Sequence, residues 1–151
     1  MKTLPANSQA TKLSLLSRKD AESLSLPILP FGISAGFPSP ALDFMESTID
    51  LNRYLIKHPA STFYGRAHGE SMKDAGINTG DILVIDKSIE PRNGIIAVCY
   101  LDGEFTLKRI KLEQTGLYLV PENDAYPPIR ISAQNELTIW GIVTFVVKKL
   151  L

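Results

Sequence analysis

From residue 62 to its C-terminus the chain is a succession of short β-rich runs, with turn residues between them and no helical pattern. The dipeptide Asp102–Gly103 between two of these runs is a strong signal for a two-residue hairpin. Because parallel strands need long crossovers, this succession predicts a mainly β domain, a compact antiparallel barrel or sandwich. The runs are TFYGRA, DILVID, IIAVCYLD, EFTLKRI, LYLVP, IRIS and LTIWGIVTFVVKKLL.

The N-terminal part of the chain predicts an extended arm. Residues 1–23 are polar without sustained periodicity and predict a flexible segment, with a short helical turn at residues 13–16. Residues 24–41 begin with alternating apolar positions and are rich in proline, which excludes a helix and a central strand. Such a segment suits a groove or a sheet edge, and an ordinary linker is the alternative. The prolines are Pro27, Pro30, Pro38 and Pro40.

One helix is predicted between the arm and the β-rich runs. Residues 47–59 have Ser47 as a candidate N-cap, apolar residues on one face and Pro59 as a stop signal. The chain therefore divides into a flexible N-terminal arm, residues 1–39, and a β-rich domain, residues 40–151.

Composition narrows the function classes. With 16 Lys and Arg against 16 Asp and Glu the net charge is zero, which argues against direct DNA binding through phosphate contacts. The chain has no apolar run long enough for a membrane span and no secretory signal at its start, so we expect a cytoplasmic protein. Cys99 is the only cysteine, and His58 and His68 lack partners at metal-ligand spacing. We therefore expect no metal and no cofactor.

Ser71 is the candidate nucleophile. It follows Gly69, which permits a tight turn, and it stands where a helical turn could begin with backbone N–H groups near its hydroxyl. A serine in such a place more often only caps a turn, and that alternative stays open.

Two residues are candidates for the base that a serine nucleophile needs. His68 lies three residues before Ser71, but the sequence places no acid to orient it. Lys108 shares one face of its strand with Thr106 and Ile110, so its amine could be partly desolvated, and desolvation lowers the pKa of a lysine. The commoner position of such a lysine is at an exposed sheet edge.

Four segments follow one another along the chain, and the second and fourth contain Ser71 and Lys108. They are AGFPSPA, IDLNRYLIKHPASTFYGRAHGESM, GDILVID and DGEFTLKRI. Through them residues 35–151 resemble the UmuD family, the LexA-related self-cleaving Ser–Lys proteins of the bacterial SOS response. The resemblance implies a LexA-type catalytic domain in which Ser71 is the nucleophile and Lys108 is the general base. It also implies cleavage of the bond between Ala35 and Gly36. The best-known UmuD proteins have cysteine in place of Ala35, whereas alanine is common in LexA and in plasmid relatives.

The resemblance further implies that a single cut changes what the protein binds. A RecA filament on single-stranded DNA would stimulate the cut, and the trimmed homodimer would be an accessory subunit of a UmuC-type translesion DNA polymerase. The family gives no catalytic role to His68. The long apolar run at residues 139–147 predicts that the C-terminal strand contributes to the homodimer, and a buried core strand of the monomer is the alternative.

Three other classes of protein remain as alternatives. A LexA-like or phage-type repressor would need a DNA-reading module before the cleavage site, and residues 1–34 contain no pair of helical patterns. A signal peptidase shares the Ser–Lys chemistry but needs a membrane anchor. In a non-catalytic β module Ser71 and Lys108 would be structural, and such a protein would not cut itself at alkaline pH.

Overall fold

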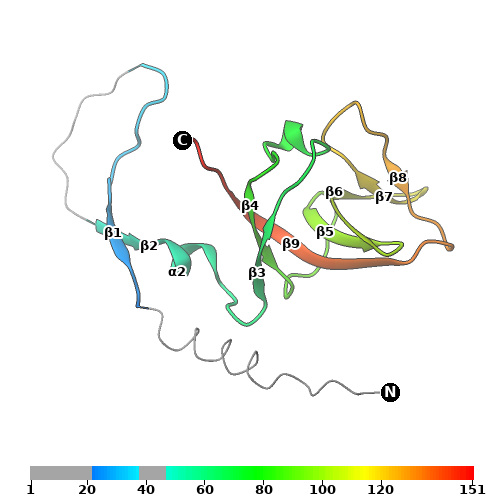
Figure 1. Ribbon diagram of the computed structural model, residues 1–151, viewed down its shortest axis with the longest axis horizontal. Helices are drawn as coiled ribbons and strands as arrows, with labels where there is room; N and C mark the ends of the chain where they lie inside the picture. The colour runs from blue at the N-terminus through cyan, green and yellow to red at the C-terminus, as the bar shows by residue number, and fades with distance from the viewer. Residues whose placement is uncertain (1–21, 38–46) are drawn as a thin grey trace, which may run out of the picture. The chain divides into compact units, whose positions relative to one another are not determined.

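The computed structural model describes residues 22–37 and 47–151 and has two units, Met1–Tyr54 and Leu55–Leu151. Figure 1 shows the chain coloured from blue at the N-terminus to red at the C-terminus.

Two expectations fall on residues that the structure does not describe. One is the helical turn at residues 13–16, and the other is the domain boundary between residues 39 and 40. The boundary therefore stays a prediction.

The first unit contains a two-stranded antiparallel sheet. Strand β1 (Ser25–Ile28) pairs with β2 (Ser47–Asp50), and Leu26 lies opposite Ile49. Strand β1 includes Pro27, which has no N–H to donate, and this sheet tolerates the proline because both of its strands are edges. The start of the proline-rich segment is thus extended, as the sequence predicts.

The helix expected at residues 47–59 is shorter than its pattern suggests, and that prediction is wrong at both ends. Residues 47–50 form β2, and helix α2 spans only Leu51–Leu55. The carboxylate of Asp50 accepts a hydrogen bond from the backbone N–H of Arg53 at 3.3 Å. Asp50 therefore takes the capping role expected of Ser47, because pairing with β1 keeps residues 47–50 extended.

The second unit is built on an open sheet of seven antiparallel strands (Figure 1). The strand order is β3-β4-β9-β5-β6-β7-β8, so β3 and β8 are the edges. Every strand of this unit overlaps one of the predicted runs, although β6 continues three residues beyond its run, and the mainly β, antiparallel prediction is confirmed, without a closed barrel. The strands are β3 (Thr62–Arg66), β4 (Ile82–Asp86), β5 (Ile96–Leu101), β6 (Glu104–Glu113), β7 (Gly116–Val120), β8 (Ile129–Arg130) and β9 (Leu137–Val147).

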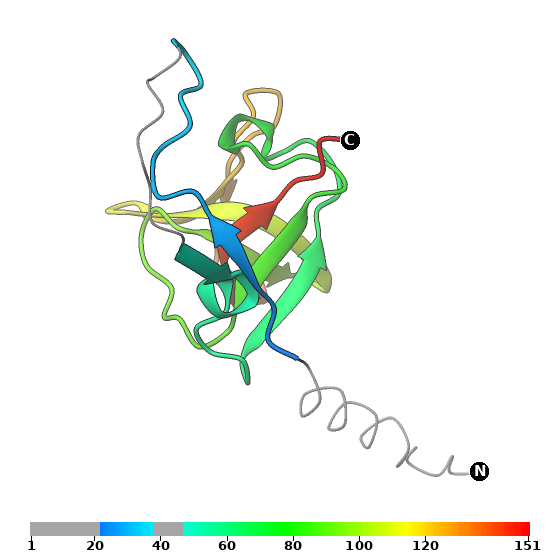
Figure 2. The same ribbon diagram turned by 90° about the vertical axis from the view of Figure 1, so that its left-hand side faces the viewer.

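Strand β9 lies in the interior of this sheet. It pairs with β4 on one side and with β5 on the other, and Figures 1 and 2 show it in red and orange across the unit. A Cβ atom on Gly141 would lie only 2.6 Å from Cγ2 of Ile85, so the strand passes very close to its neighbour. Strand β9 pairs with β4 over residues 142–147 and with β5 over residues 137–142, so it is an interior strand of the chain's own sheet, and its contribution to a homodimer stays a prediction.

The hairpin between β5 and β6 fixes the position of Lys108. Asp102 and Gly103 have φ values of 49° and 89°, the left-handed conformation that a two-residue hairpin turn requires, and the hairpin prediction is confirmed. This turn sets the register in which Lys108 faces Ala97. The alternation along β6 then buries Lys108 and Ile110 on one face.

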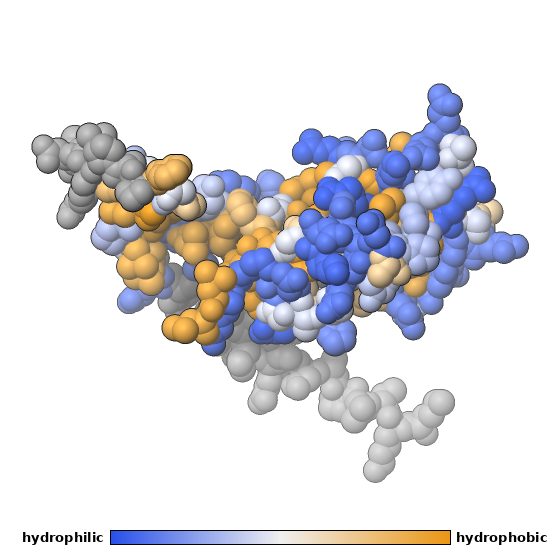
Figure 3. Space-filling view, turned by 90° about the horizontal axis from the view of Figure 1, so that it is seen from above, coloured by the Kyte–Doolittle hydropathy of each residue, from blue (hydrophilic) through white to orange (hydrophobic). Residues whose placement is uncertain are grey.

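Two apolar clusters form the core of the second unit. One is formed by β4 and the connection between β3 and β4, and the other by β5, β6, β7 and β9. The face seen in Figure 3 has hydrophilic areas interrupted by hydrophobic ones. The buried members of the first cluster are Ala67, Met72, Ile77, Leu83 and Ile85, and those of the second are Ala97, Cys99, Ile110, Leu119 and Ile142.

Candidate active site

Ser71 lies in the connection between β3 and β4, and the next residue anchors it. Met72 is 3% exposed and packs in the first apolar cluster. Before the serine, Gly69 has a φ of 89°, which allows the chain to turn there. The hydroxyl of Thr79 accepts a hydrogen bond from the Gly69 N–H at 2.9 Å and donates one to its carbonyl at 3.2 Å. The serine therefore sits on a constrained loop, followed by the short 3-10 helix η1 (Lys73–Ala75).

Lys108 reaches Ser71 from β6. Its amine Nζ lies 3.2 Å from Ser71 Oγ, 2.8 Å from Thr106 Oγ1 and 3.0 Å from the carbonyl oxygen of Leu107. The side chain belongs to the buried face of β6, and Lys108 as a whole is 8% exposed. The structure thus brings together the two residues that the sequence proposed as nucleophile and base.

The surroundings of Lys108 favour its neutral form. Burial lowers the pKa of this lysine from its ordinary value of 10.5, and the nearby Cys99 opposes the shift. Burial raises the pKa of the Cys99 thiol to about 11, although Lys108 opposes that change. No carboxylate among the described residues forms an ion pair with Lys108. A neutral amine can accept a proton, which a base must do.

His68, the other candidate base, is exposed and lines the same pocket as Ser71. Within the described part of the chain no hydrogen bond joins it to Ser71. The geometry therefore favours Lys108 over His68 as the partner of the serine.

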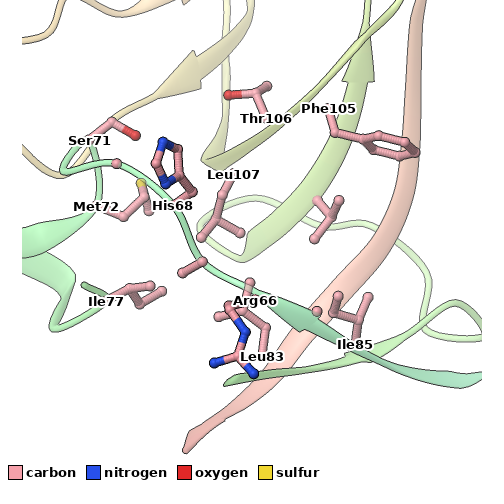
Figure 4. A pocket seen from close by; sticks show the side chains of 14 residues that line it. Arg66, His68, Ser71, Met72, Ile77, Leu83, Ile85, Phe105, Thr106 and Leu107 are labelled. Atoms are coloured by element: carbon pink, nitrogen blue, oxygen red, sulfur yellow. The ribbon is translucent and has the colours of Figure 1, made fainter. Parts of the chain in front are cut away.

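A cavity of about 280 Å³ opens beside Ser71 (Figure 4). Its walls come from β3, the loop that follows it, β4, β5 and β6. In the close-up Ser71 and Met72 lie on one side, whereas Phe105 and Ile85 lie on the other. The mixed polar and apolar lining and the modest volume suit a short stretch of extended chain with small side chains.

Ala35 and Gly36 belong to the first unit and are exposed. They lie in a bend that the hydroxyl of Ser34 closes by donating a hydrogen bond to the carbonyl oxygen of Phe37. A Cβ atom added to Gly36 would meet nothing within 4 Å.

Two other kinds of feature are absent from residues 22–37 and 47–151. These residues contain no group of three His, Cys, Asp or Glu side chains that could hold a metal ion. No helix in these segments has the length and apolar character of a membrane span.

Thr106 is a candidate site residue to which the sequence assigned no role. Its hydroxyl is the nearest hydrogen-bonding partner of the Lys108 amine. The strand alternation already put Thr106 and Lys108 on the same face, so the signal was present, but it did not show that a hydroxyl would contact the amine.

Comparisons with known proteins identify the family. Residues 27–144 match the Peptidase S24-like family. Protein SamA of Salmonella typhimurium is 45% identical over 123 residues, which cover 82% of this chain and 85% of the relative. Protein ImpA of Escherichia coli is 42% identical over 128 residues, 85% of this chain and 87% of the relative. A LexA repressor of Aeromonas hydrophila is 34% identical over 146 residues, 96% of this chain and 70% of the repressor.

Together with the fold, these matches define the class of protein, a self-cleaving serine peptidase. The chain belongs to the Peptidase S24-like family, and its resemblance to the UmuD members of that family is confirmed. The repressor is the more distant of these relatives and extends beyond the match. The comparisons therefore favour a UmuD-type protein of the SOS response over a LexA-like repressor.

Proposed function

We propose that this protein cuts its own backbone between Ala35 and Gly36, with Ser71 as the nucleophile and Lys108 as the general base. The observation that carries the proposal is the 3.2 Å contact between Ser71 Oγ and the amine of a buried lysine. A serine hydroxyl is a weak nucleophile until a base removes its proton. Among the described residues, the Lys108 amine is the base within hydrogen-bonding distance of Ser71 Oγ.

The reaction would proceed by acyl transfer. Neutral Lys108 takes the proton of Ser71, and Oγ attacks the carbonyl carbon of Ala35. The tetrahedral intermediate collapses as the protonated lysine gives its proton to the nitrogen of Gly36, which leaves. A water molecule, deprotonated by Lys108, then hydrolyses the ester between Ser71 and Ala35.

Backbone N–H groups beside the serine are suited to the negative charge of the intermediate. The N–H groups of Ser71 and Met72 make no hydrogen bond within the described residues. Because Met72 is held in the core, these donors are already fixed before the reaction. Fixed donors stabilise an oxyanion without a cost for reorganisation.

The biological output would be a change in binding. A RecA filament on single-stranded DNA would stimulate the cut by favouring the conformation in which the arm occupies the pocket, without donating a catalytic group. The trimmed chain would form a homodimer in the cytoplasm and join a UmuC-type polymerase subunit in translesion synthesis. Membership in the UmuD-type branch supports these partners. Light scattering on residues 36–151 tests the dimer, and a monomer at micromolar concentration would contradict it.

Incubation of the purified full-length chain at pH 7 to 10, followed by intact-mass measurement, tests the cleavage. We expect two products, residues 1–35 and 36–151, and no cleavage after Ser71→Ala. The variant His68→Gln is the matched control and should still cut. A new N-terminus at any residue other than Gly36 would refute the assignment of the bond, and an uncut wild-type chain would favour a non-catalytic β module.

A further inference from the structure

The connection between β7 and β8 holds the segment that carries Ser71. The backbone N–H of Glu122 donates to the carbonyl oxygen of Ser71 at 2.8 Å, and its own carbonyl accepts from the N–H of Asp74 at 2.8 Å. The side-chain amide of Asn123 donates to the carbonyl oxygen of Glu70 at 2.9 Å. Hydrogen bonds from two consecutive residues thus fix the chain before, at and after the serine.

Asn123 is itself held in a single orientation. It is 7% exposed, and its side-chain oxygen accepts a hydrogen bond from the N–H of Ala125 at 3.0 Å. Its backbone carbonyl accepts a further bond from the N–H of Tyr126 at 3.0 Å. A buried amide with both ends engaged is a rigid support, since leaving either end unpaired would be costly.

The side chain of Glu122 connects the same turn to the strand of the base. Its carboxylate accepts a hydrogen bond from Nε of Arg109, which directly follows Lys108 on β6. A second guanidinium nitrogen of Arg109 donates to the carbonyl oxygen of Gly94 at 2.6 Å. The backbone of Glu122 therefore binds the loop of Ser71, while its side chain binds the residue next to Lys108.

We propose that Glu122 and Asn123 are positioning residues that set the separation between Ser71 Oγ and Lys108 Nζ. Neither of them contacts the reacting atoms. The proposal rests on the function proposed above, because it assigns these residues to the same reaction. A displacement of about 1 Å at a reacting group can reduce a rate by roughly 100-fold, so a loose loop would slow the chemistry without unfolding the protein.

The experiment measures the reactivity of Ser71 directly. The parent is the full-length chain with Gly36→Val, which is expected to stay uncut. It is treated with a small organophosphorus fluoridate, and the labelling rate is followed by intact mass from pH 7 to 10.5. Asn123→Asp retains the acceptor for Ala125 but cannot donate to Glu70. We expect this variant and Asn123→Ala to label about 10- to 100-fold more slowly, with the pH midpoint of the parent.

The link to Arg109 is tested by a double-mutant cycle. Glu122→Ala and Arg109→Ala should each slow labelling, and the double variant should be no slower than the slower single variant, because both remove one shared contact. Glu113→Gln is the matched control, since Glu113 forms an ion pair with Lys111 on the same strand but does not contact the serine loop. This control should label at the parent rate.

The outcomes separate the two proposals. If the parent is not labelled at Ser71, the proposed nucleophile is wrong and the positioning role is lost with it. If the parent is labelled and the Asn123 variants label equally fast, only the positioning role is overturned. A slower rate that comes with a shifted pH midpoint, or with a folded fraction low enough to account for it, also overturns that role.

Discussion

Thr106 Oγ1 lies 2.8 Å from Lys108 Nζ, on the same face of β6 and two residues earlier in the chain. The carbonyl oxygen of Leu107 accepts a second hydrogen bond from the same amine at 3.0 Å. The lysine therefore has little freedom to turn from the serine. Both groups belong to β6, the strand that carries the lysine, so this support does not depend on the position of another strand or loop.

Thr106→Val tests that support. Valine has nearly the same shape but no hydroxyl, so the amine loses its nearest partner and should sample orientations away from Ser71. We expect self-cleavage to slow by roughly 10-fold, because misorientation of a catalytic group is costly. Intact-mass measurement over time gives the rate, and Thr138→Val, at an exposed position on β9, is the control. A rate equal to that of the wild type would show that Thr106 is dispensable.

Lys108→Arg tests the identity of the base. Lys108 must be neutral to act, and burial lowers its pKa below 10.5, so the rate should rise with pH and level off before that value. Below the pKa the rise is about tenfold per pH unit, the change in the neutral fraction. Arginine remains charged, so the Lys108→Arg variant should not cut itself at any pH between 7 and 10. A variant that still cuts at pH 10 would point to another base, with His68 the next candidate.

Gly36→Val tests the proposed bond. In the described structure a side chain at this position meets nothing, so the fold should be unchanged. In the reaction the branched side chain would crowd the approach of Ser71 Oγ to the adjacent carbonyl, and cleavage should stop. Circular dichroism would verify the fold, and mass spectrometry the absence of products. Efficient cutting of this variant would place the scissile bond elsewhere.

The hydrogen bonds of the Asp86 carboxylate predict that the folded protein loses stability in acid. Its carboxylate binds Nδ1 of His58 at 2.6 Å and accepts hydrogen bonds from Ser61 and Ser88. Burial alone would raise the pKa of Asp86, but these hydrogen bonds, led by that of His58, outweigh burial and lower the pKa from 3.8 to about 2. The stabilising contribution is therefore complete above pH 3.8 and is lost as the pH falls through about 2.

Urea unfolding between pH 6 and pH 2 measures this contribution. The free energy of unfolding of the wild type should fall through the acid range, and Asp86→Asn should show a shallower fall because position 86 no longer titrates. Asp124→Asn, at an exposed position, serves as the control. Parallel pH curves for the wild type and Asp86→Asn would be inconsistent with this explanation.

Gly141→Ala should destabilise the second unit. The added Cβ would lie 2.6 Å from Cγ2 of Ile85 and 3.6 Å from the carbonyl oxygen of Asp86, so β9 and β4 would have to separate. Overpacking of this kind costs about 1 to 3 kcal/mol. Thermal unfolding would measure the loss. Pairing the change with Ile85→Leu, which has no Cγ2 methyl on its β-carbon, should recover part of it.

The strands of the second unit could be predicted because their signals are local. Asp102 and Gly103 favour one turn conformation whatever lies around them, and the turn fixes the β5–β6 pairing. By contrast, residues 47–50 fit a helical pattern as well as a strand, and the choice depends on β1, about twenty positions earlier. Strand β9 posed a similar difficulty, since its apolar pattern does not reveal which strands flank it.

The candidate site was predicted in part. Ser71 and Lys108 are 37 positions apart, and no spacing rule places one beside the other. The family resemblance paired them, and the sheet register explains the contact. Glu122 and Asn123 were missed because their roles depend on backbone bonds to a loop some fifty positions earlier. The sequence shows only that Glu122 and Asn123 are polar and follow β7 and Pro121. That signal does not specify which residues they contact.

The bond between Ala35 and Gly36 lies in the connection between β1 and β2. While the chain is intact, this connection keeps the two strands at a high effective concentration, and a cut turns them into separate molecules. A pairing of four residues in a two-stranded sheet is by itself only marginally stable in water. If the fragment departs after the proposed cut, the step is one-way in practice, and each cut molecule persists until it is degraded or diluted as cells divide.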